Sequence, residues 1–170
     1  MPAPSAAAPP APLPIDAFAW RVAARIDFVV NFLLNGAIAW WFYGAAARVP
    51  LTGPGSMESM LVPMAFFLCA ITTLFGWWNA IRERRAGRVA PALAAPAGWP
   101  PRAVAGALAA GAIGVAAMWL ALRAAERLAP AAACSGAGAV AAIALAAGAL
   151  GYLFHGRAVV NGGRFAVASV

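Results

Sequence analysis

The chain has 170 residues, of which 64% are hydrophobic and only 10% are charged. Soluble domains carry about 25% charged residues, so this composition excludes a soluble globular domain and indicates a membrane protein. The formal net charge of +7 results from twelve arginines, no lysine and five acidic residues, and the arginines stand at the ends of apolar runs. A nucleic-acid-binding surface would place them in a polar patch, so we expect no nucleic-acid partner.

The first segment, residues 1–15, is rich in proline and alanine and carries no charged side chain. Proline-rich sequences of this kind do not form a packed core, and we predict a disordered cytoplasmic tail. The segment lacks the basic region of a signal peptide, so we expect the span that follows to be retained. Asp16 is a favourable helix N-cap, which predicts a helix that begins immediately after it.

Four apolar runs follow, and each is close to the ~20 residues that a helix needs to cross the hydrocarbon core of a bilayer. Inside lipid, backbone polar groups must find partners in their own segment, which favours helices. The predicted spans are residues 28–46, 60–78, 103–122 and 131–154. The sequence therefore predicts an all-α integral membrane protein with a four-helix transmembrane domain over residues 16–156.

The connections predict that these spans form two helical hairpins. Residues 49–56 contain two prolines and two glycines, which is typical of a tight connection. Residues 82–102 form a longer loop with five arginines, and residues 123–130 end the third span. Residues 157–170 are predicted to be a short cytoplasmic tail.

Arginine counts predict the orientation of the chain. Nine of the twelve arginines fall on the side that holds both termini and the middle loop, and three fall on the other side. Cytoplasmic loops of membrane proteins carry an excess of positive charge, so we expect both termini to lie in the cytoplasm. We expect the membrane to be the inner (cell) membrane of a bacterium. The expected partners are then the lipid bilayer and anionic lipid at the Arg-rich cytoplasmic face.

The third and fourth spans are dominated by small residues. Within residues 106–114 and 138–146, glycine or alanine recurs at every fourth position. Such faces let two helix backbones approach closely. We therefore expect these two spans to form a tight pair, either within the chain or across a dimer.

One polar line interrupts the first span. Asp27, Asn31 and Asn35 are four residues apart, which places them on one helix face over about 12 Å. A structural interpretation turns this line towards the second span, where threonine and asparagine side chains would hydrogen-bond to it and fix the helix register. A functional interpretation makes it part of a polar path from the cytoplasm. The full candidate polar site comprises Asp27, Asn31, Asn35, Thr72, Thr73, Asn79, Arg82 and His155.

No motif for catalysis, cofactor binding or metal binding is found in the sequence. The single histidine and two cysteines do not have metal-ligand spacing, and we expect Cys69 and Cys134 to be free thiols at different depths. Glu58 and Glu126 lie at the outer ends of spans, where Arg48, Arg123 and Arg127 are available as ion-pair partners. We therefore interpret these two acids as interfacial charges and not as a catalytic dyad.

These observations predict a non-enzymatic membrane protein that acts as an accessory or structural membrane subunit. The segments outside the spans are too short to fold as a domain, so a membrane-protein partner, or a second copy of the chain, would have to contact it within the bilayer or at its Arg-rich face. The alternative is a small oligomeric transporter or channel that uses the polar face of the first helix.

Overall fold

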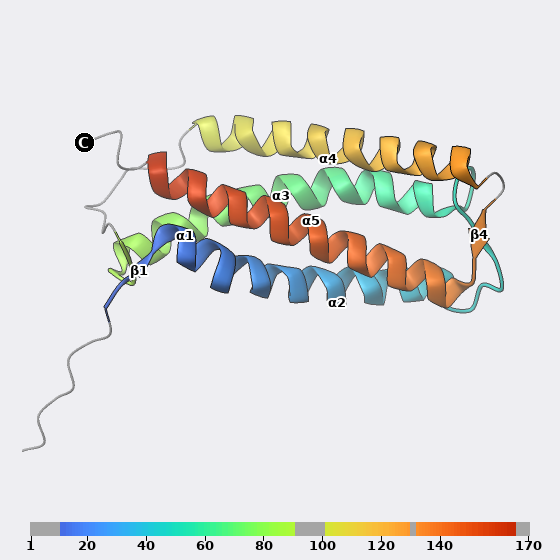
Figure 1. Cartoon of the computed structure of the whole chain (residues 1–170), viewed down its shortest axis with the longest axis horizontal. Helices are drawn as coiled ribbons and strands as arrows, with labels where there is room; N and C mark the ends of the chain where they lie inside the picture. The colour runs from blue at the N-terminus through green and yellow to red at the C-terminus, as the bar shows by residue number, and fades with distance from the viewer. Residues whose placement is uncertain (1–10, 91–100, 130–131, 166–170) are drawn as a thin grey trace, which may run out of the picture.

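The computed structural model describes residues 11–90, 101–129 and 132–165, and four long helices make up most of this part of the chain (Figure 1). The first helix is continuous and consists of α1 (Ile15–Phe18), a π-helical turn η1 (Ala19–Ala23) and α2 (Ala24–Tyr43). The others are α3 (Met57–Arg85), α4 (Pro101–Leu128) and α5 (Gly136–Phe165). Each is long and apolar enough to cross a membrane, in agreement with the four predicted spans.

The helices extend beyond the apolar runs at several ends. The first begins at Ile15 after an N-cap at Pro14, so Asp16 lies in the first turn, and the prediction that it caps the helix is wrong. Helix α5 continues to Phe165, so most of the segment from residue 157, predicted as a tail, is helical. Apolar content marks only the hydrocarbon-length part of a helix, because polar residues can continue it outside that length. The remaining tail positions, 1–10 and 166–170, lie outside the described residues.

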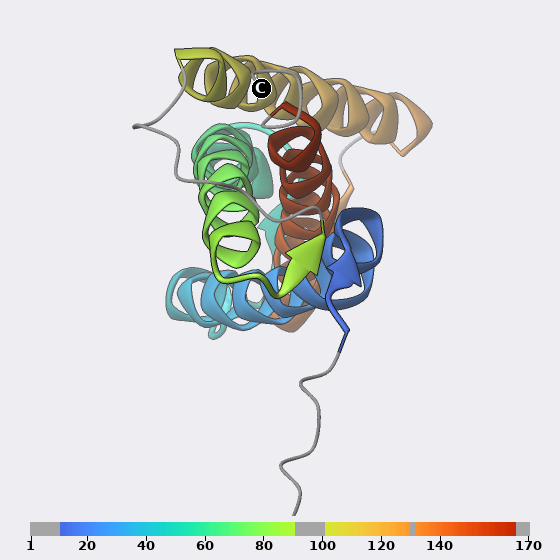
Figure 2. The same cartoon turned by 90° about the vertical axis from the view of Figure 1, so that its left-hand side faces the viewer.

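Helix α5 lies in the middle of the bundle, between α2 and α3 (Figure 1). Helix α4 packs along α3 and touches α5 only sparsely. Viewed from one end, α4 crosses on one side of the α3–α5 pair and α2 crosses on the other (Figure 2). The consecutive helices expected as hairpins, α2 with α3 and α4 with α5, are therefore not the pairs that pack along their length. In particular, α4 and α5 do not form the expected tight pair within the chain.

Glycines set the close contacts between the helices that do pack. A Cβ atom added to Gly114 of α4 would lie 2.6 Å from the Cys69 sulfur of α3. A Cβ atom added to Gly76 of α3 would lie 2.6 Å from the Cβ atom of Ala158 in α5. Small residues thus bring backbones together as expected, but the small face of α4 packs on α3, with Gly111 against Phe66 and Gly114 against Ala65 and Cys69.

Two short strands join the connections at the end of the bundle that we call the β2–β4 end. Strand β2 (Val49–Pro50) pairs antiparallel with β4 (Ala133–Cys134). The Tyr43 hydroxyl donates a hydrogen bond to the Ser56 carbonyl at 2.8 Å. Gly136 begins α5 so close to the end of α2 that a Cβ atom there would lie 2.0 Å from the Tyr43 carbonyl oxygen. The loops are therefore fixed to one another by backbone contacts.

A second strand pair defines the opposite, β1–β3 end. Strand β1 (Leu13–Pro14), which falls in the predicted N-terminal tail, pairs in parallel with β3 (Val89–Ala90). The turn into β3 is a Schellman motif, since Gly87 has a φ of 69° and the amides of Gly87 and Arg88 donate to the carbonyls of Arg84 and Glu83. This turn directs the chain back over the end of α3.

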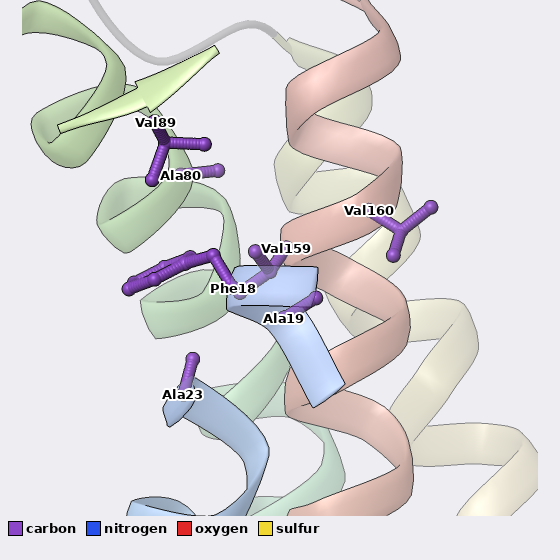
Figure 3. Close-up of a cluster of buried hydrophobic side chains, with 7 residues drawn as sticks. All are labelled: Phe18, Ala19, Ala23, Ala80, Val89, Val159 and Val160. Atoms are coloured by element: carbon purple, nitrogen blue, oxygen red, sulfur yellow. The ribbon is translucent and has the colours of Figure 1, made fainter. Parts of the chain in front are cut away.

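A compact apolar cluster lies beneath that strand pair (Figure 3). It joins the first helix, the end of α3, strand β3 and the end of α5. Its members are Phe18, Ala19, Ala23, Ala80, Val89, Val159 and Val160. Burial of these side chains holds the start of the first helix against α3 and α5, which positions the polar residues just beyond Ala23.

The glycine contacts lead to a first prediction. Gly76→Ala should lower the midpoint of thermal unfolding in detergent, because the new methyl group would collide with Ala158 and with the His155 carbonyl, 2.8 Å away. Gly106→Ala in α4 is the matched control, since nothing lies within 4 Å of the added methyl group. Overpacking of a close contact costs about 1–3 kcal/mol. Equal melting midpoints for the two variants would show that the α3–α5 contact is not tight.

Candidate functional site

The polar line of α2 is hydrogen-bonded within its own helix. The Asn31 amide nitrogen donates to the Asp27 carbonyl oxygen at 2.8 Å and to Oδ2 of the Asp27 carboxylate at 2.9 Å. The Asn35 amide nitrogen donates to the Asn31 carbonyl oxygen at 3.0 Å. Both asparagines are buried. Side chains that bond to the backbone four residues earlier satisfy at least one of their donors without help from another helix.

The polar line faces α5 and not α3. A Cβ atom added to Gly151 of α5 would lie 2.7 Å from the Asp27 carboxylate and 2.8 Å from the Asn31 amide nitrogen. The expectation that the line is turned into the bundle agrees with the burial of Asn31 and Asn35, but the expected contact with the second span is wrong. The reason is that Gly151 lets the α5 backbone approach α2 directly, so that α2 packs along α5 and not along α3.

Four of the eight predicted site residues meet at a hollow near the β1–β3 end. Asp27 from α2, Asn79 and Arg82 from α3 and His155 from α5 all line this hollow, which we call the polar hollow. Its volume is about 360 Å³. The lining also includes apolar side chains of the first helix, namely Phe18, Val22, Ala23, Ile26 and Val30. Three helices that are distant in sequence therefore contribute polar groups to one place.

Asp27 and His155 are neighbours in this hollow. Nδ1 of His155 lies 3.2 Å from Oδ1 of Asp27, within ion-pair distance. The alignment of the two groups does not meet hydrogen-bond geometry, and neither ring nitrogen has a hydrogen-bond partner among the residues that the structure describes. The imidazole is buried. An imidazole beside a carboxylate, with no hydrogen-bond partner on either ring nitrogen, places an uncompensated polar group in the wall of the hollow.

Glu83 and Arg88 also line the polar hollow and were missed by the sequence prediction. Glu83 is buried and accepts hydrogen bonds from Arg82 at 2.9 Å and from Arg88 at 2.6 Å. These bonds raise the pKa of the Arg88 guanidinium above its usual value. The signal in the sequence was the position of Glu83 directly after Arg82 and among four arginines within residues 82–88, because a single carboxylate among arginines is a natural ion-pair partner.

Arg84 is a further buried residue, which in the sequence counts only as one of the nine arginines on the predicted cytoplasmic side. Its side chain is 1% exposed and donates to the Gly163 carbonyl at 2.5 Å. The last carbonyls of a helix have no partner within the helix, and a cation there is also favoured by the helix dipole. Arg84 therefore ties the end of α3 to the end of α5.

The two threonines of the predicted site do not join the polar hollow. The Thr72 hydroxyl donates to the Cys69 carbonyl in its own helix at 3.4 Å. Thr73 lines a different groove, between α3, α4 and α5. Both are buried. Neither threonine is among the residues that line the polar hollow.

The predicted ion pairs at the β2–β4 end are confirmed for one arginine. Arg123 of α4 donates to Glu58 of α3 and, at 2.6 Å, to Glu126 in its own helix. Thr52 also donates to Glu126, at 2.7 Å. Both cysteines are free thiols, as predicted.

No protein-family model, no curated protein and no solved structure matches this chain. The chemistry of the site therefore has to be inferred from its own geometry. Within the described ranges, no group of three histidine, cysteine or acidic side chains is placed to hold a metal ion. The site consists of a polar line on α2 that is hydrogen-bonded within its own helix and of the polar hollow at one end of this line. The hollow contains the carboxylate–imidazole pair of Asp27 and His155 and the ion pairs of Glu83 with two arginines.

The hydrogen bonds of the polar line give a second prediction. Asn31→Leu should lower the thermal midpoint, because it removes both bonds to Asp27 and places branched carbon atoms against Gly151. The loss should be about 1–3 kcal/mol. Asn35→Leu, which removes one bond to a backbone carbonyl, should have a smaller effect. Neither change should reduce insertion, since leucine is more apolar than asparagine.

Asp27→Asn is the control for charge at this position. The amide oxygen can still accept from Asn31, so stability should change less than for Asn31→Leu. Thermal unfolding monitored by tryptophan fluorescence would rank the three variants. A ranking with Asp27→Asn as the most damaging would mean that the carboxylate–imidazole contact, and not the amide line, holds α2 on α5.

Proposed function

We propose that the chain is a multi-pass protein of the bacterial inner membrane that acts as an accessory or structural membrane subunit without catalytic activity. The observation that carries this proposal is the contrast between the inside and outside of the first long helix. Its amides and carboxylate are directed towards α5, while its outward face is apolar and exposed. The exposed large side chains of α2 that do not line the polar hollow are Val29, Leu33, Leu34, Ile38, Trp40, Trp41 and Phe42. Such a face suits lipid or the helix of a partner.

The distribution of arginine supports the proposed orientation. Both ends of the described chain, β1 and the end of α5, lie at the β1–β3 end (Figure 1). By their positions in the elements, that end holds Arg21, Arg25, Arg82, Arg84, Arg85, Arg88, Arg102 and Arg157, and the other end holds Arg48, Arg123 and Arg127. With the positive end inside, both termini would be cytoplasmic. The same end would attract anionic lipid.

The partner is proposed to be a membrane protein or a second copy of this chain. Trp41 is 87% exposed and lies on the apolar face of α2 near the β2–β4 end. Helix α4 also has one long side uncovered, with Leu108, Ile113 and Leu120 exposed. Two helix faces on opposite sides of the α3–α5 pair are thus available for contacts within the bilayer (Figure 2).

The orientation is a third prediction. A fluorescent-protein fusion after residue 90 should be bright and an alkaline phosphatase fusion there inactive, because that position would be cytoplasmic. The reverse should hold for fusions after residue 54. Active phosphatase after residue 90 would place the Arg-rich end outside and contradict the proposed topology.

A second candidate function is a small oligomeric transporter or channel. The polar hollow favours it, since Asp27, Asn79, Arg82 and His155 line a volume of about 360 Å³. Against it, the polar line above the hollow is covered by α5 at Gly151. A path across the bilayer would therefore need this contact to open or a second subunit to complete it.

Purification in a mild detergent distinguishes the two functions and is the fourth prediction. The accessory role predicts a larger membrane protein in fixed ratio with the chain, retained when Asp27 is changed to Asn. The transport role predicts a homo-oligomer whose melting midpoint rises with a specific solute, and Asp27→Asn should abolish that rise. Recovery of the second pattern without a partner would overturn the proposed role.

A further inference from the structure

Two sulfur atoms meet at the β2–β4 end of the bundle. The Sγ atom of Cys134 lies 3.6 Å from the Sδ atom of Met57. The two residues are 77 positions apart in the chain, one in strand β4 and the other at the start of α3. We call them the sulfur pair. Neither residue lines the polar hollow, which lies at the opposite end of the bundle.

The backbone of the connections holds the sulfur pair in place. Strand β4, which contains Cys134, is paired with β2. The amide of Gly136 donates to the Ala46 carbonyl at 2.9 Å, which fixes the chain just after Cys134. The amide of Glu58 donates to the Leu51 carbonyl at 3.1 Å, which fixes the first turn of α3 beside β2. The two sulfur atoms are thus brought together before any ligand binds, so that binding requires little reorganisation.

The sulfur pair lies at the edge of an apolar cluster. Met57 is buried in this cluster together with Val49 and Leu61. Cys134 packs against the same cluster but is only partly buried. An ion from solution can therefore reach the thiol, and the surroundings that it enters are largely apolar.

The separation of the two sulfur atoms fits a metal ion bound to both. With metal–sulfur bonds of about 2.3 Å, two sulfur atoms that are 3.6 Å apart enclose an angle of about 100° at the metal. This angle is close to the tetrahedral value. Both sulfur atoms can therefore bind one ion without a shift of the backbone.

The ligand chemistry selects a soft ion. Thiolate and thioether are soft ligands that favour copper(I), whereas zinc is bound by cysteine, histidine and carboxylate groups. The acids of this end, Glu58 and Glu126, are both ion-paired with Arg123. The single histidine, His155, lines the polar hollow at the other end. The described residues around the sulfur pair therefore favour a soft ion over a hard or borderline one.

The charge of the ion follows from the apolar surroundings. When a thiol binds a metal ion, its S–H bond breaks, the electron pair stays on sulfur to form the S–metal bond, and the proton passes to solvent. A monovalent ion with one thiolate has no net charge, because the thioether is neutral. A divalent ion would leave a net positive charge in an apolar site, which is costly without a counterion. The site therefore fits a monovalent ion, and its binding changes no oxidation state.

We propose that Cys134 and Met57 bind one soft monovalent metal ion, copper(I) or its redox-stable analogue silver(I), at the β2–β4 end. Both sulfur atoms are direct ligands. The exposed side of Cys134 leaves room for a further ligand from solution. This inference goes beyond the proposed accessory role and does not depend on it.

The test uses the full chain, reduced and purified in detergent micelles. Silver(I) is titrated in a chloride-free buffer, and zinc(II) is titrated in parallel. Native mass spectrometry should find one silver ion per chain, with the loss of one proton, and silver should raise the thermal midpoint. Zinc should do neither. Equal binding of zinc(II) would overturn the proposal, because the site would then not select a soft monovalent ion.

Substitutions of the two ligands test the site directly. Cys134→Ser should abolish silver binding, while Cys69→Ala, which removes the buried thiol between α3 and α4, should retain it. Met57→Leu conserves volume and should weaken silver binding by at least about tenfold in competition with thiosulfate, since even the groups that only support metal ligands contribute about 10–100-fold.

Met64→Leu is the matched control for Met57→Leu, because Met64 packs against the same cluster but lies about 10 Å further along α3. Equal affinities of these two variants would overturn the site, since the thiol alone would then hold the ion. Loss of silver binding in Cys69→Ala with retention in Cys134→Ser would also overturn it.

A second measurement needs no substitution. X-ray absorption of the chain loaded with copper(I) under oxygen-free, reducing conditions should show at least two sulfur neighbours at about 2.3 Å from copper. A first shell with a single sulfur atom, completed by nitrogen or oxygen, would show that Met57 is not a ligand and would overturn the proposal.

Discussion

The close approach of backbones at glycine is the constraint on which the rest of this fold depends. Three helix pairs are in extended contact, and each has a glycine at a point where a Cβ atom would collide: Gly151 for α2 and α5, Gly76 for α3 and α5, and Gly114 for α3 and α4. Between apolar helices in lipid, no hydrophobic force selects a partner, and packing geometry decides instead. The positions of these glycines thus determine that α5 is central and α4 peripheral.

The number, type and approximate position of the long helices could be predicted because they follow from local physics. An apolar run of membrane length must satisfy its own backbone, and only a helix does so within one segment. The ion pairs of Arg123 with Glu58 and Glu126 were also foreseeable, because opposite charges at the same helix ends meet in most arrangements. The order in which the helices pack could not be predicted, since glycine and alanine recur on both α4 and α5 and either face could have served.

The same uncertainty limited the prediction of the site. Asp27, Asn79, Arg82 and His155 were expected at one end of the bundle and do line one hollow, because their depth follows from helix position alone. Thr72 and Thr73 were assigned to the wrong face because that assignment required α3 to lie against α2. The amides of Asn31 and Asn35 were expected to bond between helices, yet their partners lie in the preceding turn of α2. The depth of a residue in the bundle follows from its position along its own helix, whereas the neighbour that its helix face contacts depends on tertiary packing.

The hydrogen bonds within α2 have a consequence for biosynthesis. The helix that covers the polar line, α5, leaves the ribosome after α2, α3 and α4, and α3 does not pack along α2 in its place. In a membrane, α2 would therefore wait through the synthesis of about a hundred residues, at roughly 5–20 residues per second, before its partner arrives. Because each amide already donates to a group four residues earlier, the newly made helix can wait in lipid with fewer unsatisfied donors. The intrahelical hydrogen bonds thus allow α2 to insert into the membrane long before α5 packs against it.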